Sequence, residues 1–206
     1  MNKIENLMTE KVLKIILNKY KMSLNVLPTE SFDVYDFIKK EFKKSDDITK
    51  NHLFTFVYRS FYGLDNAGLS SELKVKYFEL LQEYRNKPID LKKIFFNLNN
   101  DKNSIEFSLV TKLANTIDFS YPIYDSEVIR LFNFKQPYYL KEENAKIEKY
   151  LEQYQHILFV SNKLIKNDAI LSIFDEMNEL FGDSCINMSD SKKLDALMRG
   201  VGKVIS

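Results

Sequence analysis

Glycine and proline are scarce in this 206-residue sequence, with five and four occurrences. Because both residues interrupt helices and build turns, their scarcity argues against a fold of many short strands. The one cysteine, Cys185, excludes an internal disulfide bond and any metal site with several cysteine ligands. A chain with so little cysteine suits a reducing compartment, and we therefore expect a cytoplasmic protein.

Long uncharged apolar runs are also absent. No window approaches the length of about 18 residues that a membrane-spanning helix needs. The segment MNKIENLMTEKVLKIILNKYK carries charges throughout its apolar positions, unlike a signal peptide. The formal net charge is +1, so a nucleic-acid partner would need a local basic patch that the average hides. We expect no membrane partner.

The motifs of common cofactor and metal sites are missing. The segment GVGK has neither a strand before it nor room for a helix after it, so it is no phosphate-binding loop. His52 and His156 are far apart in the sequence, and we interpret both as structural or solvent-contacting residues. Cys185 has no adjacent histidine that would activate it. We therefore expect neither a metal ion nor a cofactor.

Apolar residues make up 45% of the chain, and they recur at helical spacing along most of it. This periodicity predicts an all-α fold of about nine or ten helices, as one domain over residues 1–206 or as two lobes with a cleft between them. The segment DDITKNHLFTFVYRSFYGLDNAGLS contains one of these helices, and we expect the apolar side of that helix to face the core. Its members are Leu53, Phe56, Val57, Phe61 and Leu64.

The most informative segment is VTKLANTIDFSYPIYDSEVIRLFNF, residues 110–134. Its pattern predicts a helix, a short polar loop with a proline, and a second helix whose inner side holds Val128 and Leu131. Asp125 lies at the N-cap or in the first turn of the second helix, where its carboxylate accepts backbone N–H bonds. These hydrogen bonds and the positive N-terminal end of the helix dipole both favour the ionised form of Asp125 at neutral pH. Asp125 is therefore either a helix cap or a carboxylate placed for chemistry.

Three basic residues each have two interpretations. Lys112 lies at the border of an apolar helix face, so its ammonium group either reaches solvent or enters a cleft. Arg130 follows Asp125 by five residues, and it either contacts a phosphate or pairs with Glu127. Arg59 lies among aromatic residues that either line a polar cleft for nucleic acid or belong to the core.

The segment around Lys112 and Asp125 resembles the helix-hairpin-helix superfamily of base-excision DNA glycosylases. That superfamily has a lysine in a pattern like K-x-A, then a short loop, then an aspartate in a pattern like V-D-x-x-V-x-R. TKLAN followed by IYDSEVIRLFNF is similar to that pair. The sequence is closer still to divergent bacterial proteins with an 8-oxoguanine-glycosylase-like fold. Those proteins carry F-x-T-K-x-L, then I-x-D-S-x-V, then a late K-x-L-D-x-x-L-W element.

The segments FSLVTKLAN, IYDSEVIRLF and KKLDALMRGVGK occur in the same order in this chain, over roughly its C-terminal half. Lys193, Leu194, Asp195 and Leu197 match the last element, while Met198 stands where an aromatic residue is usual. The Gly-rich hairpin of the superfamily is replaced by LNNDKNSIEF, which contains no glycine.

The resemblance implies a DNA-binding protein that cleaves the N-glycosidic bond of a flipped nucleotide. It gives Asp125 the role of stabilising an oxocarbenium-like transition state, and Lys112 the role of the Schiff-base amine of glycosylases that are also AP lyases. DNA is then the expected partner. Lys102 would replace the missing glycine hairpin as a phosphate contact, with Arg59 and Arg130 as further nucleic-acid-binding candidates.

A second hypothesis is a helical interaction module without catalysis, for example one subunit of a bacterial assembly for phage defence or regulation. Its long aromatic-rich helix would then bind a protein partner. The two hypotheses differ in geometry. The glycosylase hypothesis predicts that Lys112 and Asp125 approach across one concave, positively lined cleft, whereas the second hypothesis predicts an exposed apolar patch on a helix face.

Overall fold

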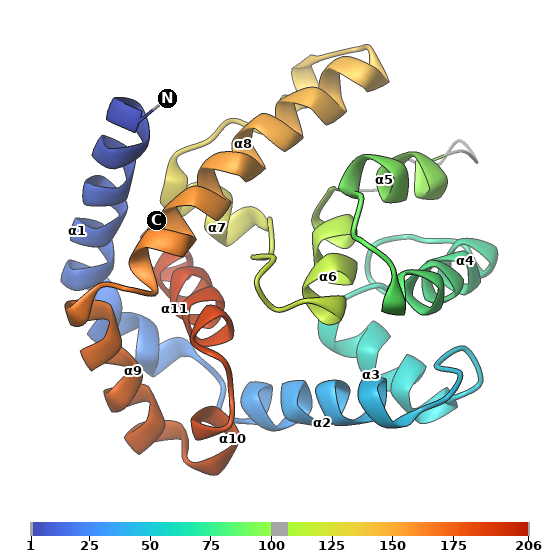
Figure 1. Ribbon diagram of the computed structural model, residues 1–206, viewed down its shortest axis with the longest axis horizontal. Coiled ribbons are helices and arrows are strands. Elements are labelled where there is room, and N and C mark those ends of the chain that lie inside the picture. The colour runs from blue at the N-terminus through green and yellow to red at the C-terminus, as the bar shows by residue number, and fades with distance from the viewer. Residues whose placement is uncertain (1, 100–106, 206) are drawn as a thin grey trace. The chain divides into compact units, whose positions relative to one another are not determined.

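The computed structural model describes residues 2–99 and 107–205, and within those ranges the chain is helical and has no strand. The predicted all-α fold class is confirmed (Figure 1). The described ranges contain eleven α-helices and two short 3-10 helices. In chain order they are α1 (Asn2–Val26), α2 (Glu30–Lys44), α3 (His52–Tyr62), α4 (Ser71–Glu83), η1 (Tyr84–Asn86), α5 (Leu91–Asn99), α6 (Phe107–Ile117), α7 (Ser126–Phe132), η2 (Pro137–Tyr139), α8 (Glu143–Leu164), α9 (Asp168–Phe181), α10 (Asp183–Ile186) and α11 (Asp190–Val204).

The periodicity predicts about nine or ten helices, and the described ranges contain eleven α-helices, of which α10 has only four residues, too few to show a helical period. Helix α1 continues to Val26, since the first proline after it is Pro28. Gly182 follows α9 with a φ of 67°, a left-handed conformation that glycine adopts without strain. Among the described residues, no helix combines the length and apolarity that crossing a bilayer requires.

The chain divides into two compact units. The first unit consists of Met1–Thr29 and Phe119–Ser206, and the second unit is Glu30–Asp118. The second unit is thus an insertion between α1 and the remaining helices of the first unit.

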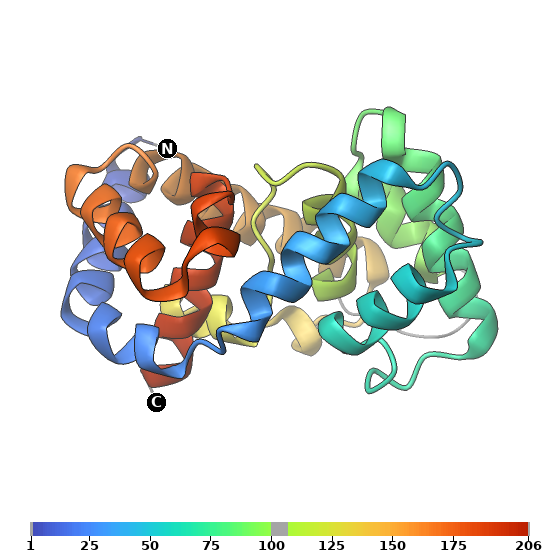
Figure 2. The same ribbon diagram turned by 90° about the horizontal axis from the view of Figure 1, so that it is seen from below.

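In the first unit, α11 packs against both α1 and α7 (Figure 1, Figure 2). Two glycines of α11 allow these close approaches. A Cβ atom added to Gly200 would lie 3.2 Å from the Cβ of Ser23 in α1. A Cβ added to Gly202 would lie only 2.2 Å from the carbonyl oxygen of Glu127 in α7. The backbones of α7 and α11 therefore touch at a point where only glycine fits.

The second unit has an aromatic core, in which α2 packs on α3 and α5 packs on α4 and α6. Buried tyrosine hydroxyls in this core contact one another and the main chain. The Tyr58 hydroxyl lies 3.1 Å from that of Tyr77 and 3.0 Å from Oγ1 of Thr116. The Tyr77 hydroxyl donates to the carbonyl oxygen of Leu109 at 3.0 Å.

The prediction for the inner face of α3 is wrong for Leu53 and Phe56, whose side chains are 59% and 60% exposed. The fully buried residues of this helix are Phe54 and Tyr58 instead. Their ring centroids are 5.5 Å apart, and the Tyr58 hydroxyl has polar partners. Burial of a tyrosine is favourable when its hydroxyl has hydrogen-bond partners. The face of α3 with Phe54 and Tyr58 is therefore the buried one, and the face with Leu53 and Phe56 is exposed.

Candidate functional site

The predicted site residues fall into two groups. Asp125 and Arg130 belong to the first unit, whereas Lys112 and Arg59 belong to the second unit. Lys102 lies outside the described residues.

Asp125 is the N-cap of α7, with extended backbone angles (φ −124°, ψ 178°). Its Oδ1 atom accepts the backbone N–H of Val128 at 3.0 Å, as the capping interpretation expects. The Asp125 side chain is only 9% exposed, however. By contrast, the Asp90 side chain, whose Oδ1 accepts the Lys93 N–H in the first turn of α5, is 41% exposed. Asp125 is thus a cap and also a buried carboxylate.

The second carboxylate oxygen of Asp125 faces α11. Nε of Arg199 lies 2.6 Å from Oδ2 of Asp125. Burial raises the pKa of Asp125 above its ordinary value, with smaller contributions in the same direction from Glu127 and Asp195. Arg199 and the Val128 N–H act in the opposite direction. The expected stabilisation of the charged form by the helix end is therefore outweighed, because desolvation of the carboxylate has the largest effect on its pKa.

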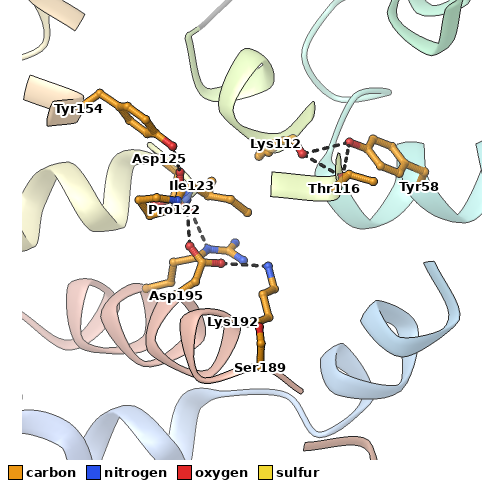
Figure 3. Close-up of polar contacts among 11 residues, drawn as sticks. Tyr58, Lys112, Thr116, Pro122, Ile123, Asp125, Tyr154, Ser189, Lys192 and Asp195 are labelled. Carbon is orange, nitrogen blue, oxygen red and sulfur yellow. Dashed lines mark hydrogen bonds and ion pairs between the residues drawn. The ribbon is translucent and has the colours of Figure 1, made fainter. Parts of the chain in front are cut away.

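One helical turn earlier, α11 carries a second ion pair. Nζ of Lys192 lies 2.9 Å from Oδ2 of Asp195, and the two side chains are 7% and 1% exposed. Oδ1 of Asp195 accepts the backbone N–H of Ile123 at 3.0 Å (Figure 3). Burial lowers the pKa of Lys192, while the attraction of Asp195 acts against that shift. This ion pair ties α11 to the chain that leads into α7.

Helix α8 holds the same stretch of chain from another direction. The Tyr154 hydroxyl donates to the carbonyl oxygen of Pro122 at 2.9 Å (Figure 3). The Tyr124 hydroxyl donates to Oε1 of Gln153. Each of residues 122–125 therefore has a buried polar contact with α8 or α11, and we call this stretch the clamped segment.

We call Asp125, Lys192, Asp195 and Arg199 the charged cluster. Sequence reasoning singled out Asp125 and, through the resemblance, Asp195, but it missed Lys192 and Arg199. The signal was present, because Lys192, Asp195 and Arg199 recur at spacings of three and four with alternating charge. Such a pattern usually marks a solvated helix face, so only the packing of α11 shows that it is largely buried.

In the second unit, Lys112 binds the end of α3. Its Nζ atom donates to the carbonyl oxygen of Tyr62, the last residue of that helix, at 3.0 Å. The Lys112 carbonyl accepts from Oγ1 of Thr116 at 2.9 Å and from the Tyr58 hydroxyl at 3.4 Å (Figure 3). A cation at the C-terminal end of a helix is favourable, so Lys112 stabilises α3.

The two arginines of the prediction also have local contacts. Nε of Arg59 lies 3.7 Å from Oδ2 of Asp65, a carboxylate that Lys74 also contacts at 2.8 Å. Nη1 of Arg130 donates to the carbonyl oxygen of Gly202 at 2.7 Å, near the end of α11. A phosphate contact of either arginine stays a prediction.

Other features of the described residues lie away from the charged cluster. A groove of ≈ 420 Å³ is formed by side chains of α1 and α9. These are Lys21, Leu24, Asn25, Glu176, Glu179 and Leu180. Cys185 is buried, and burial raises the pKa of its thiol. Among the residues described, no group of three or more histidine, cysteine, aspartate or glutamate side chains is arranged to hold a metal ion.

Comparison with protein-family models, with curated proteins and with solved structures finds no match to this chain.

Proposed function

We propose that the protein binds DNA and cleaves the N-glycosidic bond of a flipped nucleotide, with Asp125 as the carboxylate that stabilises the developing sugar cation. The observation that carries the proposal is the buried carboxylate of Asp125 at the end of the clamped segment. The elements that contain Asp125 and Asp195, two of the three in the resemblance, contact each other there through Ile123.

Helix capping alone does not account for a buried charge at position 125. Neutral side chains cap four other helices of this chain, and they do so without burying a carboxylate. These caps are Asn51 of α3, Ser70 of α4, Asn167 of α9 and Ser189 of α11. Burying an ionisable group is costly unless it is paired, and such groups with shifted pKa values concentrate at functional sites.

The clamped segment supplies what electrostatic catalysis requires. A charge stabilises a transition state best when its position is fixed before the reaction, so that no reorganisation is needed. Contacts from α8 and α11 fix residues 122–125 in this way.

Lys112 has a separable role in the proposal. Its deprotonated amine forms a bond to C1′ of the sugar as the C1′–N bond to the base breaks, and the base leaves. Opening of the C1′–O4′ bond then gives a Schiff base, with the proton lost by the amine taken up at O4′, and this Schiff base makes strand cleavage possible. The predicted approach of Lys112 to Asp125 across one cleft stays a prediction, because the two residues belong to different units.

Base release from oligonucleotides tests the role of Asp125. The substrates are single-stranded and duplex DNA with uracil, hypoxanthine, 8-oxoguanine or an alkylated purine. We expect release by the wild type and a loss of roughly 100-fold or more in Asp125→Asn. Asparagine still caps α7, so the loss isolates the charge. Asp168→Asn, which makes the same change at an exposed position of α9, should keep the wild-type rate.

Borohydride trapping on the same substrates and on abasic DNA tests Lys112. A trapped adduct in the wild type that disappears in Lys112→Gln supports lyase chemistry, and Lys149→Gln on α8 serves as the matched control. Base release without a trapped adduct would support cleavage of the glycosidic bond and contradict the proposed lyase chemistry of Lys112. If no substrate releases its base, and the protein does not bind DNA at low salt, the proposal is wrong.

The exposed side chains of Leu53 and Phe56 favour a second candidate, a non-catalytic interaction module. This candidate expects no base release. It also expects a protein partner whose binding is lost in the Leu53→Ser/Phe56→Ser double variant while the fold, measured by circular dichroism, is unchanged.

A further inference from the structure

Arg199 is the member of the charged cluster that fixes the second oxygen of Asp125. The Val128 N–H holds Oδ1 at 3.0 Å, and Arg199 Nε lies 2.6 Å from Oδ2. The two contacts come from different helices, so together they fix the plane of the carboxylate and not only its distance from α7. The Arg199 side chain is 33% exposed, whereas that of Asp125 is 9% exposed.

The pairing of Arg199 with Asp125 follows from the contacts of Asp195. Asp195 precedes Arg199 by four residues on α11, a spacing at which opposite charges usually pair. Both oxygens of Asp195 already have partners, Oδ1 in the Ile123 N–H and Oδ2 in the Lys192 ammonium. The Lys192–Asp195 pair therefore leaves the Arg199 charge available to Asp125.

Arg199 lies near the close crossing of α7 and α11. At Gly202 the two backbones approach so closely that an added Cβ would lie 2.2 Å from the Glu127 carbonyl oxygen. Gly200 approaches α1 less closely, because an added Cβ there would lie 3.2 Å from the Cβ of Ser23. Arg199 precedes Gly202 by three residues on α11, so it lies about one helical turn from this close backbone contact with α7.

We propose that Arg199 is a positioning residue for Asp125. Its guanidinium group keeps the Asp125 carboxylate ionised and oriented for the glycosidic step. This inference rests on the proposed function of Asp125 and adds to it the control of its charge. Without the guanidinium group, the buried carboxyl group would hold its proton to a higher pH, and the charged form that stabilises the sugar cation would be lost at the acidic end of the working range.

The charged groups around Asp125 determine the direction of this effect. Glu127 on α7 and Asp195 on α11 raise its pKa, as burial does, and Arg199 lowers it. Lys192 on α11 is paired with Asp195. Removing Arg199 therefore removes the positive charge closest to Asp125 and raises the carboxyl pKa further.

A carboxyl ¹³C NMR titration of Asp125 tests the inference without any need for activity. The spectrum of Asp125→Asn assigns the signal. In Arg199→Gln we expect the titration midpoint to move up by about one to three pH units, the range that an adjacent opposite charge produces. Arg199→Met, which keeps the apolar part of the side chain, is measured in parallel. If only one of the two variants folds, its titration midpoint tests the role of Arg199. Arg199→Lys should restore most of the midpoint, because it keeps the positive charge.

The matched control is Lys149→Gln, which removes a cation that pairs with Glu152 elsewhere in the first unit. It should leave the Asp125 midpoint unchanged. In parallel, the acidic limb of the base-release rate against pH should move with the midpoint, upward in Arg199→Gln and back in Arg199→Lys.

The outcomes separate the two proposals. A folded Arg199→Gln or Arg199→Met variant with the wild-type midpoint overturns the role of Arg199, whether or not bases are released. A raised midpoint with no base release by the wild type overturns the glycosidic function and leaves the control of the Asp125 charge in place. A raised midpoint together with a shifted acidic limb supports both.

Discussion

At the scale of single residues, the Tyr58 hydroxyl joins three helices of the second unit. It belongs to α3 and contacts the hydroxyls of Tyr77 on α4 and Thr116 on α6. Burial raises the pKa of Tyr58 well above its usual range, so the phenol stays neutral. The same hydroxyl approaches the Lys112 carbonyl oxygen at 3.4 Å, which links this network to the backbone that carries the candidate amine.

Removing that hydroxyl should weaken the fold measurably. In Tyr58→Phe, the hydroxyls of Tyr77 and Thr116 each lose a buried partner, so we expect the free energy of unfolding to fall by about 1–3 kcal/mol. Urea denaturation followed by circular dichroism measures the change. Tyr139→Phe, at a side chain that is 55% exposed, should change the stability by less than about 0.5 kcal/mol. Equal stability of the two variants would contradict a structural role for the network.

The two properties of Asp125 differ in how far the sequence could predict them. Its capping role depends on the few residues around it, and SEVIRLF following an aspartate is enough to indicate a helix start. Its burial and raised pKa depend on α11, which lies about seventy residues later in the chain. No local pattern contains that information, so the sequence suggested a more acidic carboxyl group than the structure shows.

At the scale of helices, the crossing of α7 and α11 depends on one glycine. Gly202→Ala should lower the free energy of unfolding by roughly 1–3 kcal/mol, because the new Cβ meets backbone that cannot move aside. Gly200→Ala is the matched control, since its Cβ would meet side-chain atoms of Ser23 and Leu27 at 3.2–3.3 Å, which can adjust. The alanine at position 200 also favours the helix. Thermal or urea unfolding compares the two variants, and a Gly202→Ala protein as stable as Gly200→Ala would contradict the close crossing.

Helix positions were largely predictable, whereas the face that a helix buries was less so. Apolar spacing and caps such as Ser70 and Gly182 mark where the helices begin and end. Helix α3 is apolar on two sides, so periodicity alone could not decide between Leu53 with Phe56 and Phe54 with Tyr58. The choice depends on partners for the tyrosine hydroxyl on α4 and α6, which the sequence of α3 does not contain.

At the scale of the whole molecule, the second unit has a core of its own. Its buried side chains come from all of its helices, and Ile38, Phe54, Leu81 and Ile94 are each at most 1% exposed. The charged cluster and the clamped segment lie entirely in the first unit.

We expect residues 30–118, expressed alone, to fold into a helical protein with a cooperative thermal transition, because the unit buries its own apolar side chains. Circular dichroism and amide hydrogen exchange measure this. The matched control is the same segment with Leu81→Asp, which places a charge in the core and should abolish the transition. A wild-type segment without cooperative unfolding would show that the unit needs the rest of the chain.

The packing of α1 on α11 also has a consequence for protein synthesis. Helix α1 is translated early, yet its main partner emerges from the ribosome only after the whole second unit has been made. During that interval Val12 and Ile16, which are buried in the finished protein, have no α11 to cover them. The nascent chain therefore exposes the apolar side of α1 until α11 has been made. We expect a chaperone to bind the nascent chain at α1.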